Sequence, residues 1–183
     1  MNLREMINEV LKDIDDSLPD SDIIGWINRA LDDLTPVAKY QKITNLSLFT
    51  GDKYVALPTD LQEVVLLTDG DQDYNEIPIN DRSGIGYKKW GDNFIFQPVL
   101  DIDKDLTLYY YAKLPHLTED SDEPAIRIDF HDLLVLYATA KAKYKDEVME
   151  FHQSTMQEYL ERKRQFTNEV SSGDVGVYQV KLL

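Results

Sequence analysis

The 183-residue sequence has no cysteine and only three histidines. It has no apolar run as long as a bilayer-spanning helix, which needs about 20 residues. The absence of cysteine excludes disulfides, thiolate metal sites and cysteine nucleophiles. The histidines, His116, His131 and His152, do not share a helical turn, so they do not form a ready-made zinc site. We therefore expect no membrane partner, no metal and no cofactor.

Positive charge is also scarce. The sequence contains 19 basic and 34 acidic residues, which gives a net charge of −15. This balance disfavours an anionic membrane surface, and it disfavours sequence-specific nucleic-acid binding, because phosphate contacts require clustered Lys and Arg. An acidic face can instead repel DNA that slides past it, although the charge can equally serve only to keep the protein in solution.

Motifs for catalysis are missing from the sequence. There is no nucleophile elbow GxSxG, no phosphate loop GxxxxGK[ST] and no HExxH. The stretch Gly84-Ile85-Gly86 lacks the third glycine and the following helix of a dinucleotide site, and a β-turn explains it better. The sequence therefore predicts no catalytic residue, and we expect a protein that is not an enzyme.

An acid-rich tip is the strongest candidate for a metal site. Asp69, Asp71 and Asp73 alternate as at the start of a calcium loop, but Tyr74 and Asn80 replace the glycine and glutamate that such a loop requires at positions six and twelve. A second triplet fails in the same way: Asp101, Asp103 and Asp105. Hairpin turns also use Asp and Gly, so we favour a structural turn. A small acidic enzyme or metal-dependent regulatory module remains the alternative.

Residues 1–41 have the pattern of a helical hairpin. Asn2 can cap a first helix with apolar residues at helical spacing, and a second helix is expected to start near Ser21 or Asp22. Pro36 can disturb this helix without ending it.

Residues 42–114 change to the short alternating runs of an antiparallel β-lobe. Three hairpins are predicted, namely ITNLSLF with YVAL, EVVLL with YNEIPI, and GYKKW with FIFQP. The final strand DLTLYYYAKL places four residues on one face: Leu106, Leu108, Tyr110 and Ala112.

Residues 115–170 return to helix, with Asp129 expected as a cap, and residues 171–183 form an extended C-terminal tail. The economical arrangement packs the C-terminal helices with the N-terminal ones. We thus predict an α+β fold in which a helical bundle carries an inserted antiparallel β-lobe.

Two segments are candidate contact sites. The basic cluster Arg162, Lys163 and Arg164, with Lys141, Lys143 and Lys145 before it, suits an acidic neighbour and is a possible subunit interface. The alternative is a solvated helix face on which Glu158 and Glu161 pair locally.

The tail after Gly173 alternates in a β-prone pattern. Such a terminal strand can add to its own sheet or to an exposed edge of another chain, and we give the two equal weight. The candidate partner-binding residues are Val175, Val177, Tyr178, Val180 and Leu182.

The sequence resembles the head–tail connector, or adaptor, proteins of tailed bacteriophages. The resemblance covers residues 1–170 and is carried by IIGWINRALDDL (23–34), YVALPTDLQEVVLL (54–67), FIFQPVLDIDKDLTLYYYAKLPHLTEDSDEPAI (94–126) and the helix that starts DFHDLLVLYATAKAKY. These are soft patterns of apolar, Pro and Asp positions and carry no chemical signature.

The resemblance implies a structural virion protein at the neck, made in the host cytoplasm. Such proteins assemble as a dodecameric ring that binds the portal protein, lead the DNA channel to a tail or stopper protein, and often hold the portal with their C-terminal segment. The alternatives are another tail-completion protein, a stopper or terminator, and a binding module with no link to a phage.

Overall fold

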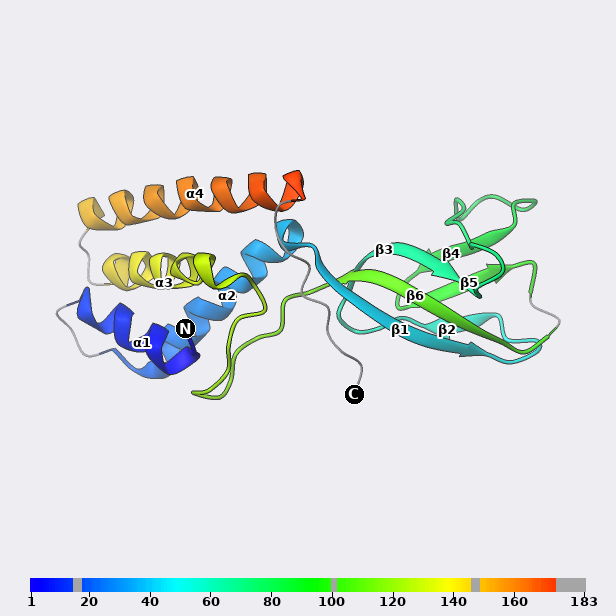
Figure 1. The fold of residues 1–183 in the computed structure, drawn as a ribbon, viewed down its shortest axis with the longest axis horizontal. Helices are drawn as coiled ribbons and strands as arrows, with labels where there is room; N and C mark the ends of the chain where they lie inside the picture. Colours follow the sequence, from blue (N-terminus) through cyan, green and yellow to red (C-terminus); the bar gives the residue numbers. More distant parts are fainter. Residues whose placement is uncertain (15–17, 100–101, 146–148, 174–183) are drawn as a thin grey trace. The chain divides into compact units, whose positions relative to one another are not determined.

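The computed structural model describes residues 1–14, 18–99, 102–145 and 149–173, with helices at both ends of the chain and strands between them (Figure 1). The helices are α1 (Leu3–Lys12), α2 (Asp20–Ala38), η1 (Ile128–Phe130, a 3₁₀ turn), α3 (Asp132–Lys145) and α4 (Met149–Ser172). The strands are β1 (Tyr40–Leu48), β2 (Tyr54–Ala56), β3 (Leu61–Thr68), β4 (Gly86–Trp90), β5 (Asn93–Gln97) and β6 (Lys104–Ala112). The predicted α+β fold, with terminal helices around a β-region, is confirmed.

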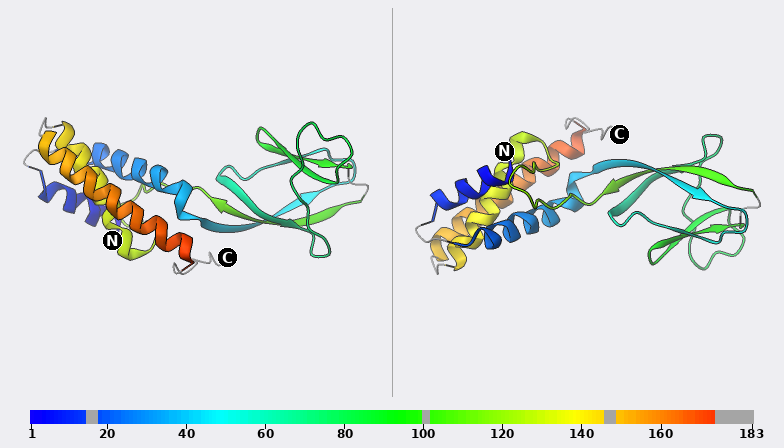
Figure 2. Two further views of the ribbon diagram at one scale, coloured as in Figure 1. Left: turned by 90° about the horizontal axis from the view of Figure 1, so that it is seen from above. Right: turned by 90° about the horizontal axis from the view of Figure 1, so that it is seen from below.

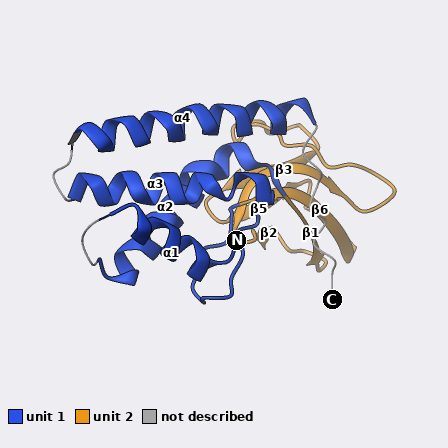
Figure 3. Cartoon of the chain, turned by 60° about the vertical axis from the view of Figure 1, so that its left-hand side comes forward, with its two compact units in different colours: residues 1–40, 113–178 blue, residues 41–112, 179–183 orange. Residues whose placement is uncertain are grey.

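The chain divides into two compact units (Figure 3). The helical unit contains Met1–Tyr40 and the described residues from Lys113 onward, and the β unit contains Gln41–Ala112. The β unit is therefore an insertion between α2 and the second half of the helical unit.

Helix α1 starts at the cap that the sequence predicts. The Asn2 side chain accepts a hydrogen bond from the Glu5 amide (2.9 Å), and the Glu5 carboxylate accepts one from the Asn2 amide (3.0 Å). This reciprocal capping box satisfies two amides that the helix itself leaves without partners. The buried face of α1 consists of Leu3, Met6, Ile7 and Val10.

Helix α2 begins at Asp20, slightly earlier than predicted, and passes through Pro36 to Ala38. The Thr35 hydroxyl donates to the Leu31 carbonyl (2.9 Å) and accepts from the Leu114 amide (3.2 Å). Thr35 therefore ties the last turns of α2 to the chain that returns from the β unit.

The four helices share one apolar core, in which α3 packs against each of the other three. α3 and α4 lie side by side along most of their length (Figure 2). Aromatic residues of α4 close this core, with the Phe166 ring centroid 5.1 Å from that of Phe130 and the Tyr159 centroid 5.2 Å from that of Tyr137. Its largest side chains with less than 2% exposure include Leu3, Met6, Ile7, Ile23, Ile27, Leu31, Leu34, Phe130, Tyr159 and Phe166.

The predicted helix cap at Asp129 is wrong. Asp129 lies in the middle of the 3₁₀ turn η1, and α3 starts only at Asp132. The Asp129 carboxylate pairs instead with Arg127, with 3.0 Å between Oδ2 and Nε. Because Asp129 already lies inside a helical turn, it does not stand directly before α3 in the extended conformation that an N-cap requires.

The β unit holds two three-stranded sheets, ordered β1-β6-β3 and β2-β5-β4. The predicted hairpin of β1 with β2 is therefore wrong, because β1 pairs with β6, and β2 pairs with β5 (Tyr54 opposite Ile95). The turn at Thr50–Asp52 carries the chain from one sheet to the other.

The predicted second hairpin forms at its turn but does not continue along the strands. Strand β3 pairs with β6, and the chain after the acid-rich tip runs along β4, where Glu76 bridges Tyr87 in parallel. At the tip, Thr68 bridges Asp73, and the Tyr74 amide donates a hydrogen bond to the Leu67 carbonyl (2.8 Å).

The predicted third hairpin, β4 with β5, is confirmed. Trp90 lies opposite Asn93, and Gly91 adopts the positive φ (56°) that this turn requires.

The inner faces of the two sheets form the core of the β unit. On β6 the four residues predicted to share a face are all buried: Leu106, Leu108, Tyr110 and Ala112. The other sheet contributes Tyr87, Phe94 and Phe96, and the Tyr87 and Phe94 ring centroids are 4.5 Å apart. Since each sheet buries one face and the unit is compact, the buried faces pack together as in a β-sandwich.

Candidate functional site: assembly surfaces

The acid-rich tip is built around Asp69. One Asp69 oxygen accepts the amides of Asp71 (3.1 Å) and Gln72 (2.9 Å), and the other accepts the Tyr74 hydroxyl (2.9 Å) and the Lys104 ammonium. The Lys104 hydrogen bond, followed by those of the turn amides, holds the pKa of Asp69 far below its usual value. The Asp69 carboxylate therefore has internal donors for the bonds that a cation would otherwise take.

Other acids of the β unit serve turns in the same way. Asp103 accepts the amide (2.7 Å) and hydroxyl (2.8 Å) of Thr50, and these bonds lower its pKa. Asp101 lies outside the described residues. Among the residues that the structure describes, no group of three or more His, Asp or Glu side chains is arranged to hold a metal ion.

The glycines of the stretch SGIGYKK have backbone roles. Asp81 accepts the amides of Ser83 (2.8 Å) and Gly84 (2.9 Å), which makes a tight turn. A Cβ at Gly86 would lie 2.2 Å from the Asn75 carbonyl oxygen, so only glycine allows the neighbouring segment to run beside β4. The predicted turn therefore ends at Gly84, and Gly86 serves a different purpose, the close approach of two backbone segments.

The three histidines have different partners. His131 is buried, with Nδ1 2.9 Å from the Met1 amino nitrogen and Nε2 3.0 Å from the Ile126 carbonyl oxygen. Burial lowers its pKa. His116 contacts Asp32 at the surface, and His152 contacts the Ala140 carbonyl (2.8 Å).

Two members of the basic cluster contact other helices of the same chain. Arg162 pairs with Asp132 of α3 (2.8 Å), and Lys163 pairs with Asp33 of α2 (2.7 Å). Arg164 is exposed and has no ion pair among the residues described. Two of these cations thus hold α4 to its neighbours, while the subunit interface that we predicted for the cluster remains a prediction.

Asp33 is also the partner of a buried tyrosine. The Tyr159 hydroxyl donates to Asp33, and burial together with this bond raises the Tyr159 pKa. Burial alone would raise the pKa of Asp33, but the hydrogen bonds from Lys163 and Tyr159 lower it.

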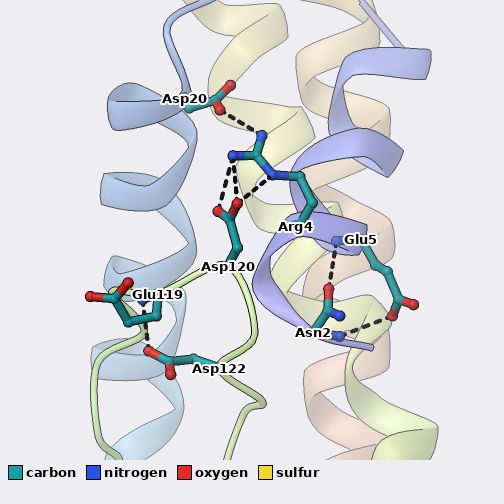
Figure 4. A network of polar contacts seen from close by, with 7 residues as sticks. All are labelled: Asn2, Arg4, Glu5, Asp20, Glu119, Asp120 and Asp122. Carbon is teal, nitrogen blue, oxygen red and sulfur yellow. Dashed lines mark hydrogen bonds and ion pairs between the residues drawn. The ribbon is translucent and has the colours of Figure 1, made fainter.

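A network of polar contacts between Arg4 and acidic residues fixes the N-terminus of α1 (Figure 4). The Arg4 guanidinium binds Asp20 (2.7 Å) and, through two nitrogens, Asp120 (2.9 to 3.1 Å). The Leu3 amide donates to the Asp122 carbonyl (2.8 Å), so the acidic loop satisfies an amide at the start of the helix. Asp120 and Asp122 of this loop therefore have structural partners.

The outer face of the β1-β6-β3 sheet carries apolar side chains that we did not predict. Hydrogen bonds join Ser47 to Asp105 (2.6 Å) and Asn45 to Thr107 (3.3 Å), so the strands are antiparallel and Ile43 lies opposite Tyr109. Leu66 of β3 lies opposite Tyr109 on its other side. We call this row, with the exposed Val65 of the adjacent β-bulge, the Tyr109 face.

The β2-β5-β4 sheet also has an open outer face. Ala56 and Trp90 flank Asn93, and Tyr54 flanks Ile95. Tyr54 is 62% exposed and Trp90 66%. We call these five residues the Trp90 face. Beyond it, the loop at Asp81–Gly84 covers the same side of the sheet, since Lys88 donates to the Asp81 carbonyl and Gln97 to the Gly84 carbonyl.

The signal for the Tyr109 face is in the sequence. The run Leu108–Tyr111 has large side chains at both odd and even positions, and a strand of that kind is expected to be covered on both faces. The predicted tail contact residues lie outside the described residues: Val175, Val177, Tyr178, Val180 and Leu182.

Apolar outer sheet faces, with acids committed to turns and helix contacts, are typical of a protein that binds other proteins. No described helix combines the length and apolar character needed to cross a membrane. A comparison with curated proteins gives no match. The family model of the SU10 adaptor protein matches residues 1–177, and the chain belongs to this family of phage head–tail adaptors. Family membership supports a structural role in the neck of the virion, in contact with portal and tail proteins.

Proposed function

We propose that the protein forms a ring on the portal and extends the DNA channel toward the tail. The family match over residues 1–177 carries this proposal, because it covers both the helical unit and the inserted β unit. We take the dodecameric state from the resemblance to head–tail adaptors. In this role the chain positions other proteins and transforms no substrate.

The charge of the chain supports a channel function. At a net charge of −15, a ring repels the phosphates of passing DNA wherever its acids face the channel. This repulsion lowers the adhesion of DNA to the wall, so packaged DNA can leave without sticking.

The proposal gives the tail a specific task. We propose that residues 174–183 bind the portal through their alternating apolar positions, as an added strand would. We keep the basic cluster as part of a subunit interface, with Arg164 as its contact residue, because Arg162 and Lys163 already hold α4 to Asp132 and Asp33.

The test combines the purified chain with its cognate portal, followed by size-exclusion chromatography and negative-stain imaging. We expect a ring that comigrates with the portal. Free monomers with no portal-bound density would overturn the proposal, and selective capture of tail-tube protein would indicate a stopper or terminator.

A truncation tests the tail separately. Deleting residues 174–183 leaves the described end of α4 intact, so we expect unchanged thermal unfolding but loss of portal attachment. Arg164→Ala in the full-length chain tests the basic cluster, and we expect it to weaken contact between subunits while attachment to the portal persists. A truncated chain that still binds the portal would exclude the tail as the contact.

A further inference from the structure

The turn at the acid-rich tip contains the only Asp-Gly pair in the sequence, Asp69-Gly70, and the sequence has no Asn-Gly pair. Gly70 has a φ of 92°, so the turn needs glycine at this position. It needs Asp69 as well, because the Asp69 carboxylate accepts two amides of the turn. The fold therefore depends on a dipeptide that is chemically fragile.

An Asp-Gly pair can rearrange without an enzyme. The glycine nitrogen attacks the side-chain carboxyl carbon of the aspartate, a C–N bond forms, and the amide proton leaves with the carboxyl hydroxyl as water. Water then opens the cyclic succinimide, mainly to isoaspartate, in which the backbone runs through the side-chain carbon. The net change is an isomerisation that needs no oxidant or reductant. Glycine allows the attack most readily because it has no side chain beside its nitrogen.

We propose that Asp69-Gly70 is the site at which this chain forms isoaspartate, and that the contacts of the tip suppress the reaction in the folded protein. One Asp69 oxygen accepts the two turn amides, and the other accepts the Tyr74 hydroxyl and the Lys104 ammonium. Ring closure removes one of these oxygens as water. Whichever oxygen leaves, two hydrogen bonds of the folded turn are lost with it.

The attacking nitrogen is engaged as well. The Gly70 amide donates to the Thr68 hydroxyl (3.1 Å), and the same hydroxyl donates to the Gln72 carbonyl (2.9 Å). The reaction removes the amide proton, so it also breaks this contact. Both reacting groups of the dipeptide are therefore held by bonds that exist only in the folded turn.

Lys104 adds an electrostatic barrier. A neutral carboxylic acid closes the ring more readily than a carboxylate, because the carboxylate repels the nucleophile and has no good leaving group. The Lys104 hydrogen bond, followed by those of the turn amides, holds the pKa of Asp69 far below its usual value. Each unit by which a pKa falls lowers the neutral fraction about tenfold at a pH above it. The folded chain thus keeps Asp69 in its less reactive form.

Isoaspartate at this position would undo the tip. The rearranged backbone gains a carbon between Asp69 and Gly70, and the carboxylate moves away from the place where the turn amides and Lys104 bind it. A structural protein of a virion is not replaced after assembly, so even a slow modification accumulates. Tyr74 and Lys104 therefore give the tip chemical durability as well as shape.

Incubation at about pH 5 tests the site. Isoaspartate is located by peptide mapping with a protease that cleaves before aspartate but not before isoaspartate. The full chain is compared in buffer and in guanidinium chloride, which unfolds it. We expect Asp69 to react fastest among the aspartates of the unfolded chain, and at least about ten times more slowly in the folded chain. Similar rates at Asp69 in the two states, or faster reaction of another aspartate in the unfolded chain, would overturn the proposal.

A matched pair of lysine substitutions tests the electrostatic barrier. Lys104→Met removes the ammonium that binds Asp69, and Lys53→Met removes an exposed ammonium of the same unit. We expect Lys104→Met to accelerate isoaspartate formation at Asp69 about tenfold, the effect of about one pKa unit, and Lys53→Met to leave the rate unchanged. Equal rates in the two variants would contradict the role of Lys104.

Two further variants separate local contacts from global stability. Tyr74→Phe keeps the ring that packs 5.9 Å from the Phe96 centroid and removes only the hydroxyl that donates to Asp69, so we expect a smaller increase in rate. Phe94→Ala destabilises the β unit without touching the tip contacts. A rise in Phe94→Ala as large as that in Lys104→Met would show that unfolding governs the reaction, and would overturn suppression by the tip.

Discussion

The Tyr159 hydroxyl should stabilise the helical unit measurably through its hydrogen bond to Asp33. Tyr159 is 1% exposed, and Lys163 pairs with the same carboxylate at 2.7 Å. A hydrogen bond to a charged acceptor is worth roughly 1.5 to 3 kcal/mol. The Asp33 side chain is 42% exposed, so we expect the low end of that range, about 1.5 kcal/mol, for Tyr159→Phe.

Thermal and urea unfolding measure this change. For a chain of this length about 1.5 kcal/mol corresponds to a Tm lower by about 3 to 6 °C. Tyr144→Phe is the matched control, because Tyr144 is 57% exposed on α3 and its loss should cost no more than about 0.5 kcal/mol. A double-mutant cycle of Tyr159→Phe with Asp33→Asn should give a coupling energy of at least about 0.5 kcal/mol.

The pH dependence supplies an independent check. Because the pKa of Asp33 is lowered in the folded state, its contacts stabilise the protein above the unfolded pKa of about 3.9 and lose this contribution as pH falls through the folded value. The deficit of Tyr159→Phe should therefore shrink in acid. A Tyr159→Phe protein as stable as Tyr144→Phe at neutral pH, or zero coupling to Asp33, would refute the reasoning.

Two further predictions concern buried groups. The lowered pKa of His131 means that the folded state binds protons less readily than the unfolded state, so stability falls as pH drops below about 6.5. His131→Gln should reduce this pH dependence, measured by urea unfolding at pH 7.5 and 5.5. An unchanged pH dependence would assign it to other groups. Phe94 is fully buried between the sheets, so Phe94→Ala should lower the free energy of unfolding by about 3 to 5 kcal/mol, measured by calorimetry. Trp90 is exposed, so Trp90→Ala should change it by no more than about 0.5 kcal/mol. Similar losses for the two variants would contradict the assignment of Phe94 to the inner face.

Two local signals in the sequence predicted local structure correctly. Asn2 caps α1 because a short side chain three residues before Glu5 suffices for a capping box, and the β4-β5 hairpin forms because Gly91 tolerates positive φ. In each case the deciding residues lie within a few positions of each other, and a single sequence is enough to recognise them.

Pairings between distant segments could not be predicted in this way. Strand β1 pairs with β6 and not with β2, because the turn at Thr50–Asp52 passes between sheets while the partner strand lies far along the chain. The same limit applies to Lys163, whose partner Asp33 is 130 residues away. Local charge patterns suggested Glu158 and Glu161 as its partners, and only the packing of α4 on α2 brings the aspartate near.

The placement of the inserted unit bears on how the chain folds. Helix α2 leads directly into β1, and β6 leads back to the remaining helices, with β1 and β6 antiparallel neighbours. Joining the two helical halves across residues 41–112 as a flexible loop would cost about 4 kcal/mol of closure entropy. Once β1 pairs with β6, that loop is already closed. Pairing of β1 with β6 would therefore bring the two helical halves of the chain close to each other in sequence connection before they pack.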